Sequence, residues 1–182
     1  FMMDKDQNFY FLEMNTRLQV EHPITEEVVG VDLVKEQIRI ANDEVLHLRQ
    51  EELFQRGHAI ECRICAEDTE NNFMPSPGII KQLTEPNGIG VRIDSYVYEG
   101  YEIPIYYDPM IGKLIVWATT RQYAIERMRR VLYEYKITGL KTNLSYLKRI
   151  MHTPDFVKGE YNTLFIEKNS RMLLRSNGNN EE

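Results

Sequence analysis

The chain has 182 residues, with 22 lysines and arginines against 28 aspartates and glutamates, so its formal net charge is −6. This acidic balance lacks the positive footprint of nucleic-acid-binding proteins, and we expect no nucleic-acid partner. The composition, 42% hydrophobic and 27% charged, is that of a globular protein. No apolar run approaches the roughly 20 residues that span a bilayer, and the 2 cysteines suit a reducing compartment. We therefore expect a cytoplasmic protein without a membrane partner.

The first segment predicts a hairpin followed by two helices. The sequence opens on an apolar stretch without an initiator methionine, which suggests an edge within a longer polypeptide. Residues 1–3 and 9–12 flank a polar turn and predict two strands, the second running on to Glu21 until Pro23 interrupts it. Helical patterns start at Thr25 and again at Asp32, and Asn42 ends the second helix.

Beyond a charged, weakly periodic passage, the sequence predicts strands first and helices afterwards. Pro, Gly and Asn separate the expected strands, which lie at 58–65, 79–83, 91–97 and 111–119. Helical periodicity returns at 123–135 and 143–151. This order predicts an α+β fold with an antiparallel sheet and packed helices. We expect one domain piece at 1–48, a second domain at 56–169 and a frayed tail at 170–182.

Residues 13–21 concentrate chemical functionality. In a strand, successive side chains point to opposite faces, so Glu13, Asn15, Arg17, Gln19 and Glu21 would share one face. A carboxylate and an amide oxygen suit Mg²⁺, the arginine offers a planar fork to an oxyanion, and the last glutamate could take a proton. The alternative is the solvated face of a half-exposed sheet, where alternating polar residues are ordinary.

Several motifs together resemble those of biotin carboxylases, which are ATP-grasp enzymes that carboxylate biotin with ATP and bicarbonate. The segment 13–23, Glu-Met-Asn-Thr-Arg-Leu-Gln-Val-Glu-His-Pro, resembles the family signature. Further matching segments follow in the family's order: 57–64, 66–68, 75–78, 106–113 and 139–143. The resemblance covers residues 1 to about 168. It implies the last strand and helices of an ATP-grasp domain, followed by the biotin carboxylase C-terminal domain.

The resemblance implies a role for most of the polar residues in the first motif. Glu13 and Asn15 would bind the Mg²⁺ or Mn²⁺ ion that neutralises the ATP phosphates. Arg17 would be the catalytic arginine that orients bicarbonate and the carboxyphosphate made from it. Gln19 and the backbone of Val20 would complete the bicarbonate pocket.

Two more catalytic residues, and three interface residues, are implied in the same way. Glu21 would be the base that deprotonates bicarbonate. Arg63 would bind bicarbonate and the ureido oxygen of biotin, where a fixed cation stabilises developing negative charge. From the sequence alone, Arg63 shares a strand face with Glu61, and an ordinary exposed ion pair is the simpler interpretation. The resemblance also implies a homodimer with these residues in or near its interface: Ile89, Arg92 and Asp108.

The same resemblance implies partners and sets limits on the isolated chain. There is no Met-Lys-Met biotin-attachment motif and no glycine-rich nucleotide loop in the sequence. We therefore expect biotin on a carrier protein or domain, a carboxyltransferase partner and no catalysis by this chain alone. The motifs look more like acetyl-CoA or propionyl-CoA carboxylases, and hence fatty acid biosynthesis, than pyruvate carboxylase. Two alternatives stay open: a non-catalytic dimerisation or docking module, and another ATP-grasp ligase such as a carbamoyl-phosphate synthetase.

Cys62 and Cys65 form a C-x-x-C pair that could suggest a zinc or redox site. Three residues apart in a strand, their side chains point to opposite faces. We expect two core thiols rather than a metal or disulfide pair.

Overall fold

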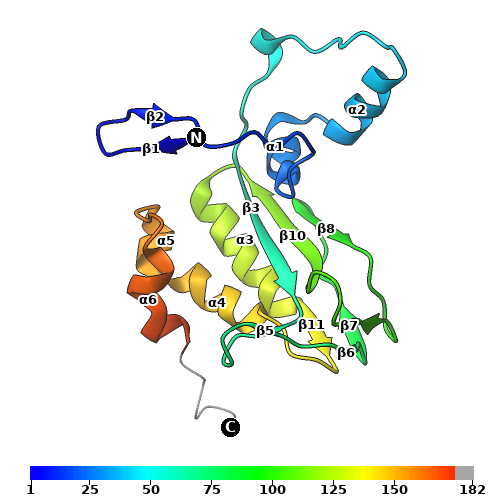
Figure 1. Cartoon of the computed structure of the whole chain (residues 1–182), viewed down its shortest axis with the longest axis vertical. Coiled ribbons are helices and arrows are strands. Elements are labelled where there is room, and N and C mark those ends of the chain that lie inside the picture. The colour runs from blue at the N-terminus through cyan, green and yellow to red at the C-terminus, as the bar shows by residue number, and fades with distance from the viewer. Residues whose placement is uncertain (175–182) are drawn as a thin grey trace.

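A computed structural model describes residues 1–174, and it confirms the expected α+β fold. A loosely packed N-terminal part lies above a sheet that is covered by helices (Figure 1). Within residues 1–174, none of the helices combines the length and apolar character that crossing a membrane requires. The helices described are α1 (His22–Val29), α2 (Leu33–Ala41), η1 (a 3-10 helix, Gln50–Glu52), α3 (Arg121–Glu134), α4 (Leu144–His152), α5 (Pro154–Lys158) and α6 (Phe165–Leu173).

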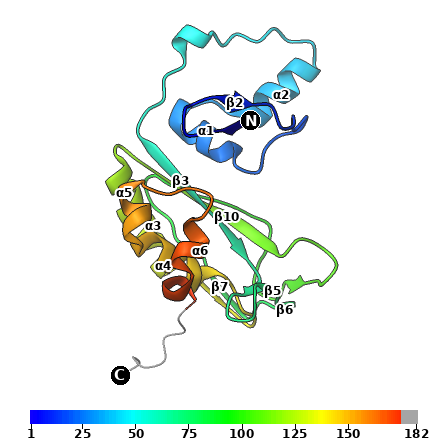
Figure 2. The same ribbon diagram turned by 60° about the vertical axis from the view of Figure 1, so that its left-hand side comes forward.

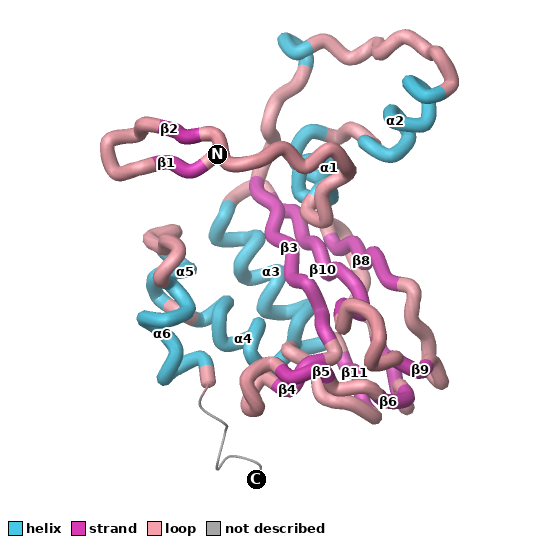
Figure 3. The backbone as a smooth tube through the Cα atoms, in the orientation of Figure 1, coloured by secondary structure: helices cyan, strands magenta, loops and turns pink. Residues whose placement is uncertain are grey.

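The strands are mostly short, and two of them are long enough to organise the fold. The long ones, β3 and β10, lie side by side at the centre (Figure 3). The strands described are β1 (Met2–Met3), β2 (Phe9–Tyr10), β3 (His58–Cys65), β4 (Glu67–Asp68), β5 (Met74–Pro75), β6 (Gly78–Ile79), β7 (Gln82–Thr84), β8 (Val91–Ser95), β9 (Glu102–Ile103), β10 (Met110–Ala118) and β11 (Lys136–Thr138).

The central sheet has three antiparallel strands in the order β3–β10–β8. In the middle strand, Lys113 lies opposite Arg63 of β3 on one side and opposite Asp94 of β8 on the other. Residues 110–118 are apolar or β-branched apart from this lysine, a composition that favours a buried strand. Strand alternation then gives the sheet two faces of different character.

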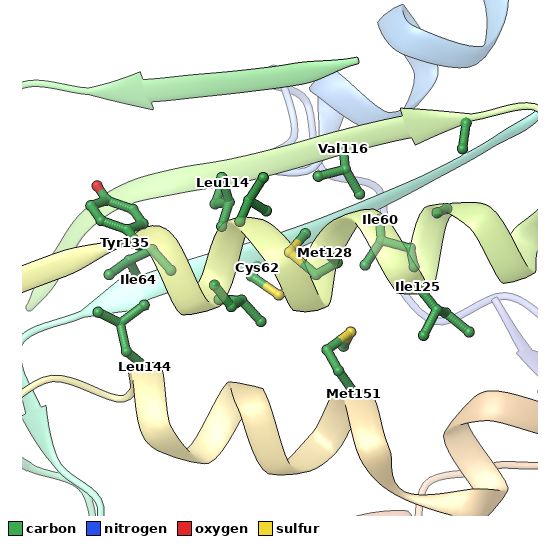
Figure 4. Close-up of a cluster of buried hydrophobic side chains, with 14 residues drawn as sticks. Ile60, Cys62, Ile64, Leu114, Val116, Ile125, Met128, Tyr135, Leu144 and Met151 are labelled. Carbon is green, nitrogen blue, oxygen red and sulfur yellow. The ribbon is translucent and has the colours of Figure 1, made fainter. Parts of the chain in front are cut away.

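One face of the sheet is apolar and packs against α3, which in turn packs against α4 (Figure 4). Thr120 begins α3, because its hydroxyl oxygen accepts a hydrogen bond from the Tyr123 N–H at 3.3 Å. Cys62 belongs to this core, whereas Cys65 lies on the other face and is half-buried. The predicted alternation is confirmed, but the expectation that both are core thiols is wrong for Cys65. The other buried members of this cluster are Ile60, Ile64, Leu114, Val116, Ala118, Ala124, Ile125, Met128, Val131, Leu132, Tyr135, Leu144 and Met151.

The opposite face of the sheet carries charge. Its charged side chains are Glu61 and Arg63 of β3, Lys113 of β10, and Arg92 and Asp94 of β8. Helix α1 and the turn before it lie over this face and contact both β3 and β10. The N-terminal part is therefore joined to a face of the sheet that carries charged groups, and α1 also buries Pro23 and Val28.

The N-terminal hairpin β1–β2 lies apart from the sheet, at the same end of the molecule as α1 and α2 (Figure 2). Its apolar side chains have no covering element within the described residues, and their exposed fractions range from 58% at Tyr10 to 76% at Phe1. The same holds for Leu12 and Met14 just beyond it. This segment presents an apolar surface of the kind that ordinarily packs against another element.

Most of the predicted elements are confirmed. Strand β3 matches its expected span, and β8, β10, α3 and α4 begin and end within two residues of theirs. The expected strand at 79–83 is instead split into β6 and β7, because the N–H groups between them bond to different neighbours. Ile80 donates to the Tyr101 carbonyl oxygen at 3.0 Å, and Lys81 donates to that of Thr138 at 2.8 Å.

The expectation of a strand up to Glu21 is wrong. Strand β2 ends at Tyr10, because no strand in residues 1–174 lies beside the segment that follows and could bond to it. Pro23 stands in the first turn of α1, where its missing N–H removes no helical hydrogen bond. The second helix is capped as expected, since Asp32 Oδ1 accepts from the Lys35 N–H at 2.8 Å and Asn42 ends the helix.

The expected frayed tail at 170–182 starts too early. Helix α6 continues to Leu173, which is fully buried beside Tyr146 and Phe165. Arg149 Nε donates to the Leu173 carbonyl oxygen at 2.6 Å and fixes the end of the helix. Residues 175–182 lie outside the described part of the chain.

Leu132 provides a test of the apolar core. Its side chain is fully buried between α3 and the sheet, so we expect Leu132→Ala to lower the free energy of unfolding by about 2 to 5 kcal/mol. Leu46→Ala is the matched control, because Leu46 is 49% exposed; its effect should stay within about 0.5 kcal/mol. Urea denaturation followed by circular dichroism measures both. Equal effects would contradict this description of the core.

Candidate functional site

The turn at residues 17–21 gathers several of the predicted site residues even though it is not a strand. Arg17 Nη1 donates to the Leu18 carbonyl oxygen at 3.1 Å and to Gln19 Oε1 at 3.4 Å. The Gln19 carbonyl oxygen accepts from the His22 N–H at 3.2 Å, which closes the turn into α1. Arg17 and Gln19 are thus neighbours, as predicted, but through a bend in the chain rather than strand alternation.

Glu21 connects this turn to the sheet. It holds the N-cap position of α1, but its side chain does not cap the helix. Instead its Oε2 lies 3.1 Å from Nη2 of Arg63, forty-two residues later in the sequence. Both side chains are about half exposed, at 56% and 52%. Two of the predicted catalytic residues therefore meet across the boundary between the N-terminal part and the sheet.

Lys113 of the central strand β10 also binds the 17–21 turn. Its Nζ donates to the Val20 carbonyl oxygen at 3.1 Å and lies 3.2 Å from Asp94 Oδ2. Only 11% of its side chain is exposed, so the ammonium group is shielded from water and its hydrogen bonds are strengthened. Lys113 fixes the peptide unit between Val20 and Glu21.

A second ionic contact joins α1 to the far strand of the sheet. Arg92 Nη1 lies 2.7 Å from Glu26 Oε2, and the same guanidinium contacts both oxygens of Asp94 at 2.7 and 3.0 Å. Hydrogen bonding to Asp94 raises the pKa of Arg92. Burial alone would raise the pKa of the Asp94 carboxyl, but hydrogen bonds from Arg92 and Lys113 outweigh it and hold that pKa below its usual value of 3.8.

Arg63 also has a neighbour on its own strand. Its Nε lies 3.8 Å from Glu61 Oε1, so the shared face that the sequence predicts is confirmed. The Glu61 side chain is only 6% exposed, and burial raises the pKa of its carboxyl. The guanidinium thus lies between one half-exposed and one buried carboxylate.

Pockets lie on both sides of Glu21. One, of about 530 Å³, is bounded by the turn and α2 and includes Arg17 and Gln19. The other, of about 610 Å³, includes Glu21, Glu61 and Arg63 and is also lined by apolar side chains of α4 and α5. Small ligands could therefore reach the turn and Arg63 from different directions.

The remaining predicted residues lie outside this cluster. Glu13 and Asn15 are exposed in the irregular segment after β2, and within residues 1–174 no group of three or more His, Cys, Asp or Glu side chains could hold a metal ion. A carboxylate and an amide oxygen are donors that Mg²⁺ accepts, but two of them make only part of a site. Ile89 is 91% exposed before β8, and Asp108 accepts from the Met110 N–H at 2.8 Å.

Sequence reasoning did not identify Lys113, Asp94 or Glu26 as supports of the turn. A single lysine inside an otherwise apolar nine-residue strand was the available signal for Lys113. Glu26 and Asp94 gave no local signal, because their partners are remote in the sequence.

Two family models match the chain, each over a different part of it. Residues 61–168 match the family described as the biotin carboxylase C-terminal domain. The chain belongs to this biotin carboxylase family. Residues 1–49 match the ATP-binding domain of the carbamoyl-phosphate synthase L chain. The resemblance inferred from the motifs is therefore confirmed on both sides of the boundary.

Curated relatives are similar over almost the whole chain. The biotin carboxylase of Nostoc sp. is 55% identical over 168 residues, which are 92% of this chain and 38% of the relative. A pyruvate carboxylase subunit from Methanothermobacter thermautotrophicus is 57% identical over 164 residues, 90% of this chain and 33% of the relative. The chain thus spans between a third and two fifths of the length of these relatives.

A solved structure agrees with the fold as well. The biotin carboxylase domain of 2-oxoglutarate carboxylase from Hydrogenobacter thermophilus superposes with a TM-score of 0.92 and 46% identity, over 95% of this chain and 38% of that chain. That protein is described as a dimer in complex with MgADP, ADP and bicarbonate.

Removing the Lys113 ammonium should loosen the turn. We expect Lys113→Met to speed amide hydrogen exchange at residues 19–22 roughly tenfold or more, because a shielded hydrogen bond from a charged donor is lost. Lys81→Met is the control, since Lys81 is exposed and lies far from the turn in the sequence. Exchange resolved by mass spectrometry measures both. Unchanged exchange at 19–22 would contradict the anchoring role.

Asp94 provides a test through pH. A carboxyl with a lowered pKa stabilises the fold above its unfolded pKa, here 3.8, and loses that contribution as pH falls through the folded value. We expect Asp94→Asn to be less stable than the unmutated chain by about 1 to 2 kcal/mol at pH 7, with the difference shrinking below about pH 4. Urea unfolding at several pH values measures this. A difference that grows on acidification would refute the assignment.

Proposed function

We propose that this chain is the C-terminal part of a biotin carboxylase, which uses ATP and bicarbonate to carboxylate biotin held on a carrier. The observation that carries the proposal is the contact between the 17–21 turn and strand β3, where Glu21 meets Arg63 at 3.1 Å. A carboxylate from the N-terminal part and a guanidinium from the central sheet meet at this contact. Family membership supports the assignment.

The turn would hold bicarbonate. Arg17 offers a planar fork to an oxyanion, its neighbour Gln19 offers an amide, and Val20 offers a backbone N–H. Glu21 would accept the bicarbonate proton, and the resulting dianion would attack the γ-phosphoryl group of ATP. The bond from the γ-phosphorus to the β–γ bridging oxygen would break, which releases ADP and gives carboxyphosphate. In support, the solved relative from Hydrogenobacter thermophilus is described as a complex with bicarbonate.

Arg63 would act on biotin. Its guanidinium is about half exposed beside a pocket of about 610 Å³ with an apolar wall. An accessible, fixed cation can stabilise the negative charge that develops on the ureido oxygen as the N1′ proton passes to the phosphate released from carboxyphosphate. The adjoining pocket gives the ring a route to that cation.

Most of the residues that hold the metal and the nucleotide would lie outside the 17–21 turn and its contacts with the sheet. Glu13 and Asn15 would contribute two oxygen ligands to Mg²⁺ or Mn²⁺, which neutralises phosphate charge when bound. We assign residues 1–48 to the end of an ATP-grasp domain and 56–169 to the C-terminal domain. The exposed apolar side chains around β1 and β2 would pack against the remainder of the ATP-grasp domain.

Several finer assignments belong to the same proposal. Partners would be a biotin carrier, a carboxyltransferase and a second copy of the chain that meets Ile89, Arg92 and Asp108. An acetyl-CoA or propionyl-CoA carboxylase of fatty acid biosynthesis in the cytoplasm remains the proposed setting. Relatives of similar identity are named for pyruvate and methylcrotonoyl-CoA carboxylases, so the acyl acceptor needs its own assay.

A chimera tests the function, with this chain replacing the matching segment of the Nostoc biotin carboxylase. We expect free biotin to stimulate its bicarbonate-dependent ADP release, and Arg63→Ala to reduce that stimulation about 100-fold or more. Arg130→Ala is the matched control, because within residues 1–174 Arg130 pairs only with Glu134 on the surface of α3. The isolated chain should release no ADP.

Two results would contradict the proposal, and each favours a different alternative. ATP turnover that ignores biotin would favour another ATP-grasp ligase. Dimerisation of a chimera that has no ATP turnover at all would favour a docking module.

A further inference from the structure

We propose that Glu61 is a positioning residue that holds the Arg63 guanidinium in place while Glu21 changes its protonation state. The inference rests on the proposed function, since it assigns Arg63 to biotin and Glu21 to bicarbonate. It is based on the arrangement of the three side chains. Arg63 lies 3.1 Å from Glu21 through Nη2 and 3.8 Å from Glu61 through Nε.

The two carboxylates differ in what fixes them. Glu61 stands two residues before Arg63 in β3, opposite the fully buried Ile115 of β10, so the central sheet sets its position. Its side chain is 6% exposed, against 56% for Glu21. Its Oε2 is buried without a hydrogen-bond partner in the described chain. A buried carboxylate with an unpaired oxygen is costly unless nearby charge compensates it.

The charges around Glu61 supply part of this compensation. Arg63 on its own strand, Lys113 on β10 and His22 at the start of α1 favour its ionised form, while Glu21 and burial oppose it. Burial raises the pKa of the Glu61 carboxyl overall. The Glu61 carboxylate thus lies near two cations, Arg63 and Lys113. Because its pKa is raised, it should become protonated at a higher pH than an exposed glutamate.

The proposed reaction makes this second carboxylate necessary. When Glu21 accepts the proton of bicarbonate, the bicarbonate O–H bond breaks, a new O–H bond forms on Glu21, and its attraction for Arg63 falls. Arg63 must nevertheless stay oriented toward the ureido oxygen. Glu61, whose side chain is only 6% exposed, keeps the guanidinium aligned from its Nε side. Glu61 also lines the pocket beside Arg63, and we assign its effect on biotin to its contact with the guanidinium.

The test uses the chimera with the Nostoc enzyme and the variant Glu61→Gln. We expect the KM for free biotin to rise about threefold to fivefold, the range for a partly exposed ion pair, with the KM for ATP unchanged. The wild-type KM for biotin should rise toward that of the variant as pH falls, while the variant should depend less on pH. Glu61→Asp keeps the charge and should give a KM for biotin between those of wild type and Glu61→Gln. It replaces Glu61→Gln in the test if that variant does not fold.

Glu67→Gln is the matched control. Burial also raises the pKa of the Glu67 carboxyl, but Glu67 forms no ion pair with the rest of residues 1–174. Its KM for biotin should equal that of wild type. An unchanged KM for biotin in both Glu61 variants, with wild type still stimulated by biotin, would overturn the role of Glu61 alone. A wild-type chimera that ignores biotin would overturn the proposed function and this inference with it.

Discussion

The hydrogen bond from Lys113 Nζ to the Val20 carbonyl oxygen sets the geometry of the candidate site. It attaches an irregular segment to the most buried strand of the fold, at 3.1 Å. Arg17, Gln19 and Glu21 lie in a segment that pairs with no strand within residues 1–174. This hydrogen bond therefore takes the place of strand pairing in restraining the segment. Because Lys113 stands opposite Arg63 in the sheet, the same residue sets the separation between the turn and Arg63.

The two faces of the central sheet thus have different roles in the fold. The apolar face packs on α3 and supplies stability that does not depend on ionisation. The charged face receives α1 and the turn through ion pairs and hydrogen bonds at Arg63, Lys113 and Arg92. Contacts of this kind fix orientation better than they add stability. A site that must exchange protons and bind small anions can be built on such a face.

The sequence predicted the elements of the sheet domain well because their apolar periodicity is strong, as in β3 and α3. It failed for residues 11–21, where alternating polar side chains resemble a strand but no neighbouring strand is present within residues 1–174 to pair with. The motifs still selected Arg17, Glu21 and Arg63 as candidates, since the resemblance depends on residue order rather than on backbone shape. The structure places two of these, Glu21 and Arg63, 3.1 Å apart. Support from Lys113 and Glu26 depends on contacts between remote segments, which local patterns do not encode.

A crystal structure of the chimera with bicarbonate would test the central claim most directly, namely that the turn docked on β10 forms the anion site facing Arg63. We expect bicarbonate within hydrogen-bonding distance of the Arg17 guanidinium and the Val20 N–H, with Lys113 still bound to the Val20 carbonyl oxygen. Bicarbonate bound elsewhere, or a turn detached from Lys113 while the anion is bound, would contradict the account.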